Sequence, residues 1–395
     1  MRLAPGRSFC VAEGGFASQT GQAPSPTGCR RNSLRLYAWA DRIPMPLAMP
    51  DIKQGRFPKT RYQGSKRAIA PLILNALRSI PYTTVLDAFG GTAAMAHAFK
   101  CAGKHVTYND LLAFNHQIGL ALVENDTLTL ADDEVRPIGD AHPGRPYDDF
   151  IERTFDGVYF TRQENRWLDV ASANVRAMAC PYRRALAYDA LFQSALAKRP
   201  YNLFHRGNLS MRLADVPRGF GNKTSWDRPF PDHLQRFASE ANAAIIDGRG
   251  TCRAVCGDVL DVEGDFDLVY IDPPYLNRRG VGVDYHHFYH FLEGIMHYDH
   301  WADLVDLASK HRRLLPRRDR WTDPKAVRSA FADLLDRFRK SVLVVSYRSD
   351  GLVSPEELCS MVRKVKRQSE VLVVSRRQYV LSTNAATHEV LVIGR

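Results

Sequence analysis

The residues with the clearest potential for chemistry are an acid, two prolines and a tyrosine that directly follow a short apolar run. The run spans residues 268–271, and the four residues after it are Asp272, Pro273, Pro274 and Tyr275. An apolar run that ends at two prolines, which cannot donate to a β-ladder, predicts a short strand buried on both faces. Asp272 should then lie at the carboxyl end of that strand, where open α/β sheets bind their ligands.

The stiffness that two prolines give this turn suits one difficult reaction. The exocyclic amine of a nucleobase is a poor nucleophile, because its lone pair is delocalised into the ring. The Asp272 carboxylate and the Pro273 carbonyl can accept its two N–H groups, and the localised lone pair can then attack a methyl sulfonium. Tyr275 can stack on the base, which is worth roughly 1–3 kcal/mol and needs the ring more than the hydroxyl. An ordinary Pro-Pro turn with a capping acid is the alternative, and these residues alone do not decide.

A second feature is a glycine turn that follows a predicted strand and precedes a predicted helix. The strand ends near Asp87, the turn contains Phe89, Gly90 and Gly91, and the helix runs from about residue 92 to 100. The arrangement is similar to a nucleotide-binding turn. The spacing Gly-x-Gly-x-x-Gly is absent, however, which argues against a dinucleotide.

The next predicted strands also end in acids. Residues 106–110 form a strand that ends in Asp110, and an acid about 20 residues after a glycine turn commonly binds ribose hydroxyls. A helix N-cap is the alternative at this position, and one carboxylate can serve both purposes. The strand pattern returns at residues 252–256, with Asp258 just beyond them. Two strands near the end of the chain should pair antiparallel.

An anion-binding step is a weaker candidate near the start of this pattern. Gly64, Ser65 and Lys66 precede a helix with apolar residues at helical spacing from Ile69 to Ile80. Such a step can present backbone N–H groups and an ammonium to an anion. It is not a Walker loop, because the leading glycine and its spacing are missing.

Residues 126–245 interrupt the alternation of strands and helices and are rich in arginine and aromatic residues. Cations interleaved with rings and amides suit phosphates and base edges. A surface loop of a helical subdomain is an alternative of equal weight. The residues that we expect near nucleic acid are Lys198, Arg199, Asn202, His205, Arg206, Asn222 and Lys223.

Three histidines, His286, His287 and His290, invite a metal site. Their aromatic neighbours, with no carboxylate pair beside them, favour a packed or base-facing aromatic loop instead, so we expect no metal. The basic run from Lys310 to Arg320 is more typical of a solvated face, although it can also meet phosphate.

The composition supports a polyanionic partner without requiring one. The chain has 54 Lys and Arg residues against 43 Asp and Glu residues, a formal charge of +11. Arginine-rich chains from GC-rich genomes become basic without such a partner, however. Seven cysteines, an odd number without paired spacing, indicate a reduced cytoplasmic protein. No apolar run approaches the ~20 residues that span a membrane.

The first 50 residues differ from the rest, with few acids and no persistent helical or strand period. An arginine-rich, acid-poor leader can be a transit peptide. We favour a disordered extension or an upstream mis-start, with Met49 opening the domain, and expect residues 1–48 to be dispensable.

The order of these elements resembles that of the DNA adenine-N6 methyltransferases of the D12 class, over about residues 55–395. Members of that family carry a Tyr-x-Gly-Ser-Lys element, a Phe-x-Gly-x-Gly turn, a target-recognition insert, Asp-Pro-Pro-Tyr and a late aromatic motif. The counterparts in this chain are residues 62–66, 89–93, 126–245, 272–275 and 346–348. One departure is Ala93, where the family usually has glycine.

The resemblance implies a Rossmann-like α/β fold with a mixed sheet of roughly seven strands. A target-recognition domain, residues 126–245, would be inserted into a catalytic domain of residues 51–125 and 246–395. The implied cofactor is S-adenosylmethionine, with Asp110 at its ribose and Asp258 at its adenine amine. The residues that the resemblance puts around it are Tyr62, Lys66, Asp87, Phe89, Gly90, Gly91, Asp110 and Asp258.

The implied function is site-specific methyl transfer to N6 of an adenine that is flipped out of double-stranded DNA. We expect a monomer in the bacterial cytoplasm, and a cognate restriction endonuclease is a further partner that the family suggests. Three alternatives stay open. Cytosine-N4 methyltransferases usually have serine at the position of Asp272, RNA adenine methylation is chemically identical, and an inactive DNA-binding relative would not need the intact turn.

Overall fold

The computed structural model describes residues 37–38, 57–216, 222–375 and 387–395, which belong to one compact unit of residues 36–395. The expected leader, residues 1–50, lies outside the described part except for two residues, Tyr37 and Ala38. Within the described ranges, no helix combines the length and the apolar character that a membrane span needs.

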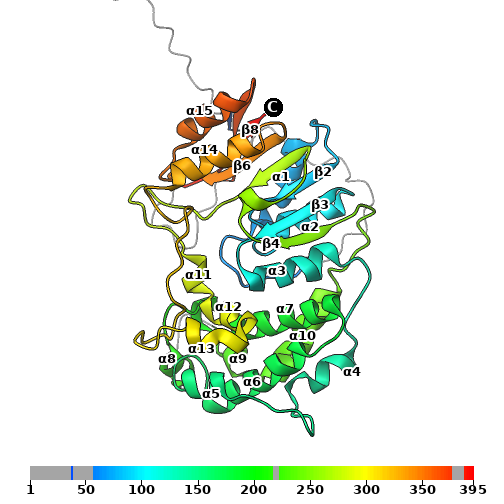
Figure 1. The fold of residues 1–395 in the computed structure, drawn as a ribbon, viewed down its shortest axis with the longest axis vertical. Coiled ribbons are helices and arrows are strands. Elements are labelled where there is room, and N and C mark those ends of the chain that lie inside the picture. The colour runs from blue at the N-terminus through cyan, green and yellow to red at the C-terminus, as the bar shows by residue number, and fades with distance from the viewer. Residues whose placement is uncertain (1–36, 39–56, 217–221, 376–386) are drawn as a thin grey trace, which may run out of the picture. The chain divides into compact units, whose positions relative to one another are not determined.

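The described strands form one mixed sheet in the order β1-β7-β8-β6-β5-β2-β3-β4 (Figure 1). They are β1 (Tyr37–Ala38), β2 (Thr84–Asp87), β3 (His105–Asp110), β4 (Arg253–Cys256), β5 (Leu268–Ile271), β6 (Val342–Arg348), β7 (Ser369–Ser375) and β8 (Glu389–Gly394). Strand β8 runs antiparallel to its neighbours β6 and β7, and the other pairs are parallel. The predicted mixed sheet of about seven strands is confirmed, and the two-residue β1 adds an edge that the sequence did not indicate.

Strand β5 lies at the centre of the sheet, between β2 and β6, and all four of its residues are buried. Leu268 and Tyr270 pack into one hydrophobic core, and Val269 and Ile271 pack into another. The alternation follows from a strand's period of two and confirms the predicted burial on both faces. Strands β2, β3 and β4 follow one another outward on one side of β5, and β6 lies on its other side. The strand order therefore reverses between β2 and β5, which makes this boundary a topological switch point.

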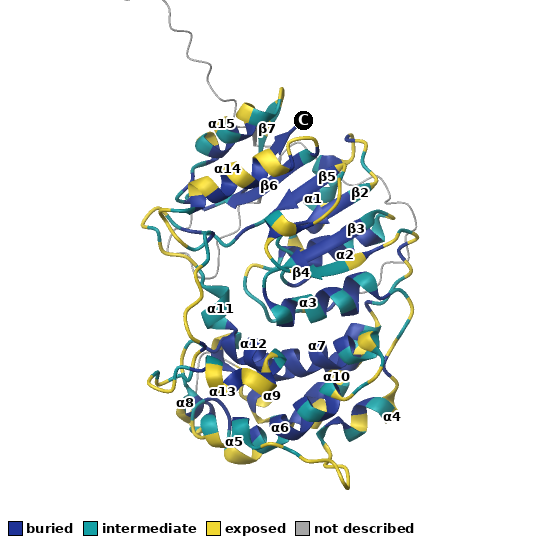
Figure 2. Cartoon of the chain, viewed as in Figure 1, coloured by how far each residue is buried: buried dark blue, intermediate teal, exposed yellow. Residues whose placement is uncertain are grey.

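Helices cover both faces of the sheet, and the central strands are dark blue between them in Figure 2. The helices are α1 (Ala70–Leu77), α2 (Ala94–Cys101), α3 (Ala113–Gly119), α14 (Val327–Arg337) and α15 (Pro355–Val365). The first three pack in the core of Tyr270, and the last two in the core of Val269. Helix α15 is capped at its start, because the Ser354 hydroxyl accepts the backbone N–H of Glu357 at 3.2 Å.

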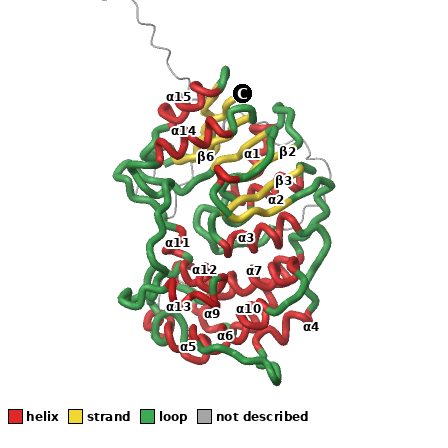
Figure 3. Tube along the Cα trace, viewed as in Figure 1, coloured by secondary structure: helices red, strands yellow, loops and turns green. Residues whose placement is uncertain are grey.

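A layer of helices, red in the lower part of Figure 3, packs on the sheet domain through contacts between α7 and α3. Its helices are α4 (Asp132–Val135), α5 (Phe150–Thr154), α6 (Arg162–Arg176), α7 (Pro181–Ala197), α8 (Leu209–Leu213), α9 (Lys223–Asp227), α10 (Phe230–Asn242), α11 (Tyr285–Phe288), α12 (His290–Met296) and α13 (Trp301–Leu304). The last three follow β5 in the chain. The Phe291 ring in α12 stacks on Phe204 at 4.9 Å, so the segment 126–245 does not build this layer alone.

Candidate active site

A pocket of about 360 Å³ opens at the carboxyl ends of the central parallel strands. Its walls come from the turn after β2, the ends of β3 and β5, and segments around residues 62–66, 257–259 and 317–321. Every residue that we expected around a cofactor lines it, namely Tyr62, Lys66, Asp87, Phe89, Gly90, Gly91, Asp110 and Asp258. Asp272 and Pro274 line the same pocket, whereas Pro273 and Tyr275 are absent from its described wall.

The glycine turn is shaped by close packing and by left-handed backbone. A Cβ atom added to Gly90 would lie 2.0 Å from the Tyr108 ring, so only glycine fits there. Gly91 has φ of +49°, and its N–H donates to the Asp110 carboxylate at 2.9 Å. Ala93 adopts φ of 63°, the left-handed region that glycine enters at less cost. The alanine that departs from the family pattern therefore adopts a glycine-like backbone conformation.

Two carboxylates on the pocket wall, the buried Asp87 and the half-buried Asp110, have raised pKa values. Asp110 accepts N–H groups from Leu112 and Gly91, both at 2.9 Å, and burial still raises its pKa to about 6. Asp87 accepts the N–H of Ala96 at 3.0 Å, and burial, followed by the nearby charge of Asp272, raises its pKa to about 8. Asp258 differs, because it caps a short turn by accepting the Leu260 N–H at 3.0 Å. The helix N-cap considered for Asp110 is wrong, because the N-cap of α3 is Leu112 and has no side-chain cap; Asp110 accepts the N–H of Leu112 itself.

Several acceptor atoms on the pocket wall have no hydrogen-bond partner among the described residues. They are Gln63 Oε1, Asp87 Oδ1, Asn109 Oδ1 and Asn115 Oδ1, and each is buried. A buried polar atom without a partner costs free energy. A wall with this surplus of acceptors suits a ligand that brings N–H and O–H donors.

An aromatic stack forms the side of the pocket next to the helical layer. The Tyr62 ring stacks on Tyr289 at 4.4 Å and on Tyr285 at 5.4 Å between ring centroids. Tyr285 and His286 line the pocket, so part of the expected aromatic loop does face it. His290 instead lies in the aromatic core and contacts the Tyr159 hydroxyl at 2.7 Å. Within the described ranges, no group of three residues is arranged to hold a metal ion.

Asp272 belongs to a polar cluster at the end of β5. Its Oδ2 lies 2.9 Å from Lys66 Nζ, and its Oδ1 accepts the Tyr275 hydroxyl at 2.6 Å. Lys66 also donates to the Tyr275 oxygen at 2.8 Å. Burial raises the pKa of Asp272 to about 6, although Lys66 acts in the opposite direction. Burial alone would lower the pKa of Lys66, but Asp272 and Glu389 outweigh it and raise that pKa.

The cluster contains a residue that we did not expect, Glu389. Its carboxylate lies 2.7 Å from the Tyr275 hydroxyl and 3.5 Å from Lys66 Nζ. The only signal in the sequence is an acid at the start of the last apolar run, and such an acid is usually exposed. The Tyr275 ring also lies edge-on to Tyr347 at 5.0 Å, so Tyr347 of the late aromatic motif supports the tyrosine.

The basic run from Lys310 to Arg320 contributes to the pocket, and the phosphate contact considered for it stays a prediction. Arg317, Arg318 and Arg320 line the pocket, and the first two are exposed. The neighbouring Trp321 lies edge-on to Phe89 with 4.8 Å between ring centroids. Sequence reasoning did not single out Trp321.

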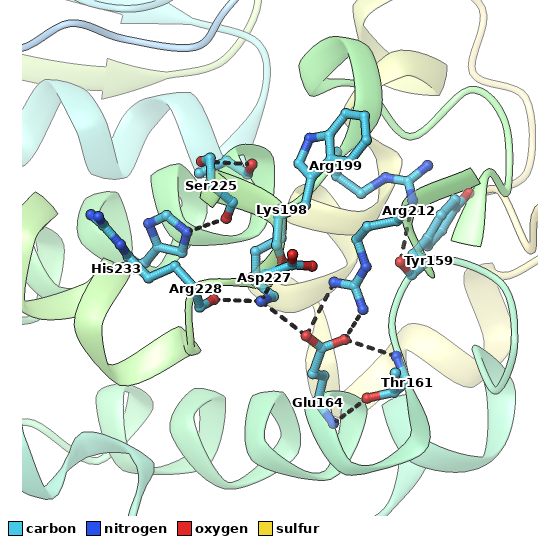
Figure 4. A network of polar contacts seen from close by, with 12 residues as sticks. Tyr159, Thr161, Glu164, Lys198, Arg199, Arg212, Ser225, Asp227, Arg228 and His233 are labelled. Atoms are coloured by element: carbon cyan, nitrogen blue, oxygen red, sulfur yellow. Dashed lines mark hydrogen bonds and ion pairs between the residues drawn. The ribbon is translucent and has the colours of Figure 1, made fainter. Parts of the chain in front are cut away.

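Two of the expected DNA-contacting residues are buried instead (Figure 4). Lys198 is 2% exposed and donates to the Trp226 carbonyl at 2.8 Å, and it pairs with Glu164 at 3.0 Å. Arg199 is 1% exposed and donates to carbonyls of Leu203 and Tyr159 at 3.2 and 3.3 Å. Burial lowers the pKa of Arg199 to about 9. Neither side chain has surface to offer a phosphate, so both hold loops of the helical layer together.

The other five candidates reach the surface to different degrees. Arg206 and Lys223 are exposed, and Lys223 pairs with Asp227 at 2.7 Å. Asn222 is exposed and caps α9 by accepting the Ser225 N–H at 3.0 Å. The remaining two are half-buried, and they are Asn202, with φ of 54°, and His205, whose ring lies 5.3 Å from that of Phe288.

Known proteins match this arrangement along most of the chain. The model of the family described as D12 class N6 adenine-specific DNA methyltransferase matches residues 62–313. The Type II methyltransferase M2.HphI of Haemophilus parahaemolyticus is 26% identical over 80% of this chain and 91% of its own length. The Type II methyltransferase M.FokI of Planomicrobium okeanokoites is 24% identical over 70% of this chain and 42% of its own. The modification methylase LlaI of Lactococcus lactis subsp. lactis is 24% identical over 82% of this chain and 52% of its own.

Proposed function

Because this chain belongs to the family of D12 class N6 adenine-specific DNA methyltransferases, we propose that it methylates N6 of an adenine within a specific sequence of double-stranded DNA. The methyl donor is S-adenosylmethionine, and the adenine is flipped out of the duplex into the pocket, at a cost of a few kcal/mol. The observation that carries the proposal is the Asp272 carboxylate. It lines the pocket at the end of β5 and is fixed there by Lys66 and Tyr275.

The pocket residues fit this cofactor in chemistry. Its ammonium, ribose hydroxyls and adenine amine are all hydrogen-bond donors, and the wall carries acceptors without partners such as Asp87 Oδ1 and Asn109 Oδ1. We assign Asp87, Tyr62 and Lys66 to the methionine part, Asp110 to the ribose and Asp258 to the adenine amine. The rings of Phe89 and Trp321 offer apolar surface beside the glycine turn. When bound, the cofactor supplies an electrophilic methyl group.

The chain's own contribution to the reaction is the polarisation of the target amine. Asp272 and the Pro273 carbonyl accept its two N–H groups, which turns the lone pair out of conjugation with the ring. Positive charge develops on the nitrogen as it reacts, and a carboxylate already fixed beside it stabilises that charge. The Tyr275 ring stacks on the flipped base, with Pro274 completing the turn. Since the Asp272 carboxyl group must be ionised to stabilise that charge, the rate should fall as the pH drops below about 6, the pKa of Asp272.

DNA would be bound by the helical layer and by the arginine segment at the pocket. Arg206, Lys223, Asn222, Asn202 and His205 reach the surface in whole or in part, and cations among them suit phosphate contacts. The exposed Arg317 and Arg318 would meet the DNA backbone near the flipped nucleotide.

Two relatives are named Type II methyltransferases. We therefore propose that the protein works in the bacterial cytoplasm beside a cognate restriction endonuclease, and we keep the expected monomer as a separate proposal.

The test is transfer of a labelled methyl group to DNA duplexes, followed by identification of the modified base. N6-methyladenine at one sequence supports the proposal. Methyl groups only on cytosine N4 or only on RNA would overturn the substrate assignment, and cofactor binding without transfer to any substrate would favour an inactive DNA-binding relative.

A further inference from the structure

Glu389 reaches the active site because β8 runs in the opposite direction to the other described strands of the sheet. It is the first residue of β8, which is antiparallel to β6, and it pairs in register with Arg348 at the carboxyl end of β6. The start of β8 therefore lies at the same edge of the sheet as the ends of the parallel strands β5 and β6. Its side chain is only 4% exposed, and a carboxylate is buried at such a site only with compensating partners.

Two of the partners of Glu389 are also the groups that hold Asp272. Its Oε1 lies 2.7 Å from the Tyr275 hydroxyl and 3.5 Å from Lys66 Nζ, and it also accepts the Ser346 hydroxyl. Tyr275 lies 2.6 Å from Asp272, and Lys66 lies 2.9 Å from it. The two carboxylates thus share one lysine and one tyrosine.

A count of hydrogen-bond donors shows that the sharing is competitive. The Tyr275 hydroxyl has one proton and can donate to only one carboxylate at a time. Lys66 carries one positive charge, which two carboxylates face at 2.9 and 3.5 Å. A hydrogen bond from Tyr275 to Glu389, or an ion pair between Lys66 and Glu389, therefore weakens the corresponding interaction with Asp272. Ser346 helps to hold Glu389 and is not a partner of Asp272 in the described contacts.

We propose that Glu389 is a positioning residue for Asp272: it holds the Tyr275 hydroxyl and shares the Lys66 charge, so that Asp272 stays fixed but keeps its strength as an acceptor for the target amine. The inference rests on the proposed function and deepens it. Without Glu389, Lys66 would pair with Asp272 alone and reduce the negative charge that the amine meets.

The electrostatics of the cluster agree in direction. Burial is the largest cause of the raised pKa of Asp272, Lys66 lowers that pKa, and Glu389 raises it again. Among the described residues, other titratable groups that interact with Asp272 include Asp87, Tyr270, Tyr275 and Tyr285. Removal of the charge at residue 389 should therefore lower the pKa of Asp272. Methyl transfer needs the ionised form, so the acidic limb of the rate profile should move to lower pH.

The test compares Glu389→Gln with the wild-type enzyme in single-turnover methyl transfer across pH, beside a cofactor titration. We expect a rate loss of about tenfold or more, the scale on which residues that orient a functional group commonly act. The acidic limb should shift to lower pH, and cofactor affinity should be unchanged. The matched control is Glu370→Gln on β7, which removes the same charge from an exposed residue that pairs with Arg395 at 2.7 Å.

A second variant keeps the test decisive if Glu389→Gln does not fold. Ser346→Ala leaves the charge of Glu389 in place but removes a hydroxyl that holds it. It should slow transfer without shifting the acidic limb. A normal rate and an unshifted limb in Glu389→Gln would overturn the proposal, as would a normal rate in Ser346→Ala when the first variant is unfolded. Failure of the wild-type enzyme to methylate adenine would instead overturn the proposed function.

Discussion

Two largely buried charge clusters in this molecule both pair carboxylates with cations but have opposite balances of charge. In the pocket cluster, one lysine, Lys66, faces two carboxylates, Asp272 and Glu389. In the helical cluster, one carboxylate, Glu164, faces two cations, Lys198 and Arg212.

The balance is reflected in the acidity of the carboxylates. The pKa of Asp272 is raised to about 6, chiefly by burial. Burial also acts to raise the pKa of Glu164, but the hydrogen bonds and charge of Arg212 outweigh it and lower that pKa. The spare donors of Lys198 are satisfied by the backbone carbonyls of Trp226 and Arg228, whereas Arg212 Nε has no hydrogen-bond partner among the described residues. A surplus of acceptors beside a pocket is available to a ligand, whereas a surplus of donors among loops holds the loops together.

The largest expected effect is on the pocket cluster. Asp272→Ala should abolish methyl transfer, because the amine loses its charged acceptor, and Asp272→Asn should be severely slowed because it keeps one acceptor without the charge. Cofactor affinity should survive in both variants. Single-turnover transfer and a cofactor titration measure these quantities, with Asp303→Ala at an exposed position as the control. Near-normal transfer by Asp272→Ala would contradict the proposed polarisation of the target amine by Asp272.

The corresponding change in the helical cluster should affect stability instead. Glu164→Gln leaves Lys198 and Arg212 buried without their carboxylate, and such losses cost on the order of 3–5 kcal/mol. Urea denaturation should show this loss, while the methyl-transfer rate per folded molecule should stay normal. Asp227→Asn, which breaks the exposed pair with Lys223, is the control and should cost at most about 1 kcal/mol. A stable but inactive Glu164→Gln would remove the distinction between the clusters.

Tyr275→Phe separates two roles of one side chain. The sequence suggests a mild effect, because stacking needs only the ring. The structure predicts a larger one, since the hydroxyl contacts both Asp272 and Glu389. Hydrogen bonds to charged groups contribute about 1.5–3 kcal/mol, which corresponds to a rate loss of roughly tenfold to a hundredfold. Tyr275→Ala should in addition lose roughly 1–3 kcal/mol of target-base binding. Equal rates for Tyr275→Phe and wild type would show that Tyr275 acts through its ring alone.

The smallest expected effect is that of a single surface cation. Arg206→Ala should weaken binding to all DNA sequences alike and reduce the salt slope of affinity by about one unit, as for the loss of one phosphate contact. Lys198→Ala should leave the slope of the folded protein unchanged and lower its stability. Fluorescence anisotropy at several salt concentrations measures both. A reduced slope in Lys198→Ala, with stability intact, would show that the buried lysine reaches DNA.

The sequence by itself determined most of the strands, although not β1, and the kinds of residue at their ends. Residues 268–271 form a buried strand because all four are apolar and two prolines soon end the run. The turn after Asp87 depends on the nearby glycines Gly90 and Gly91. The late antiparallel pair followed from two apolar runs near the end of the chain. These features depend on local spacing and on the rule that ligands meet the carboxyl ends of parallel strands.

Only the tertiary structure decided which charged side chains are available to a ligand. Lys198 and Arg206 look alike in the sequence, yet the first is buried against Glu164 and the second is exposed. Glu389 joined Asp272 because β8 runs antiparallel to β6, a pairing that brings together residues more than a hundred positions apart. Burial and partnership of a charge depend on packing between distant segments, and a local pattern of residue types carries no information about that packing.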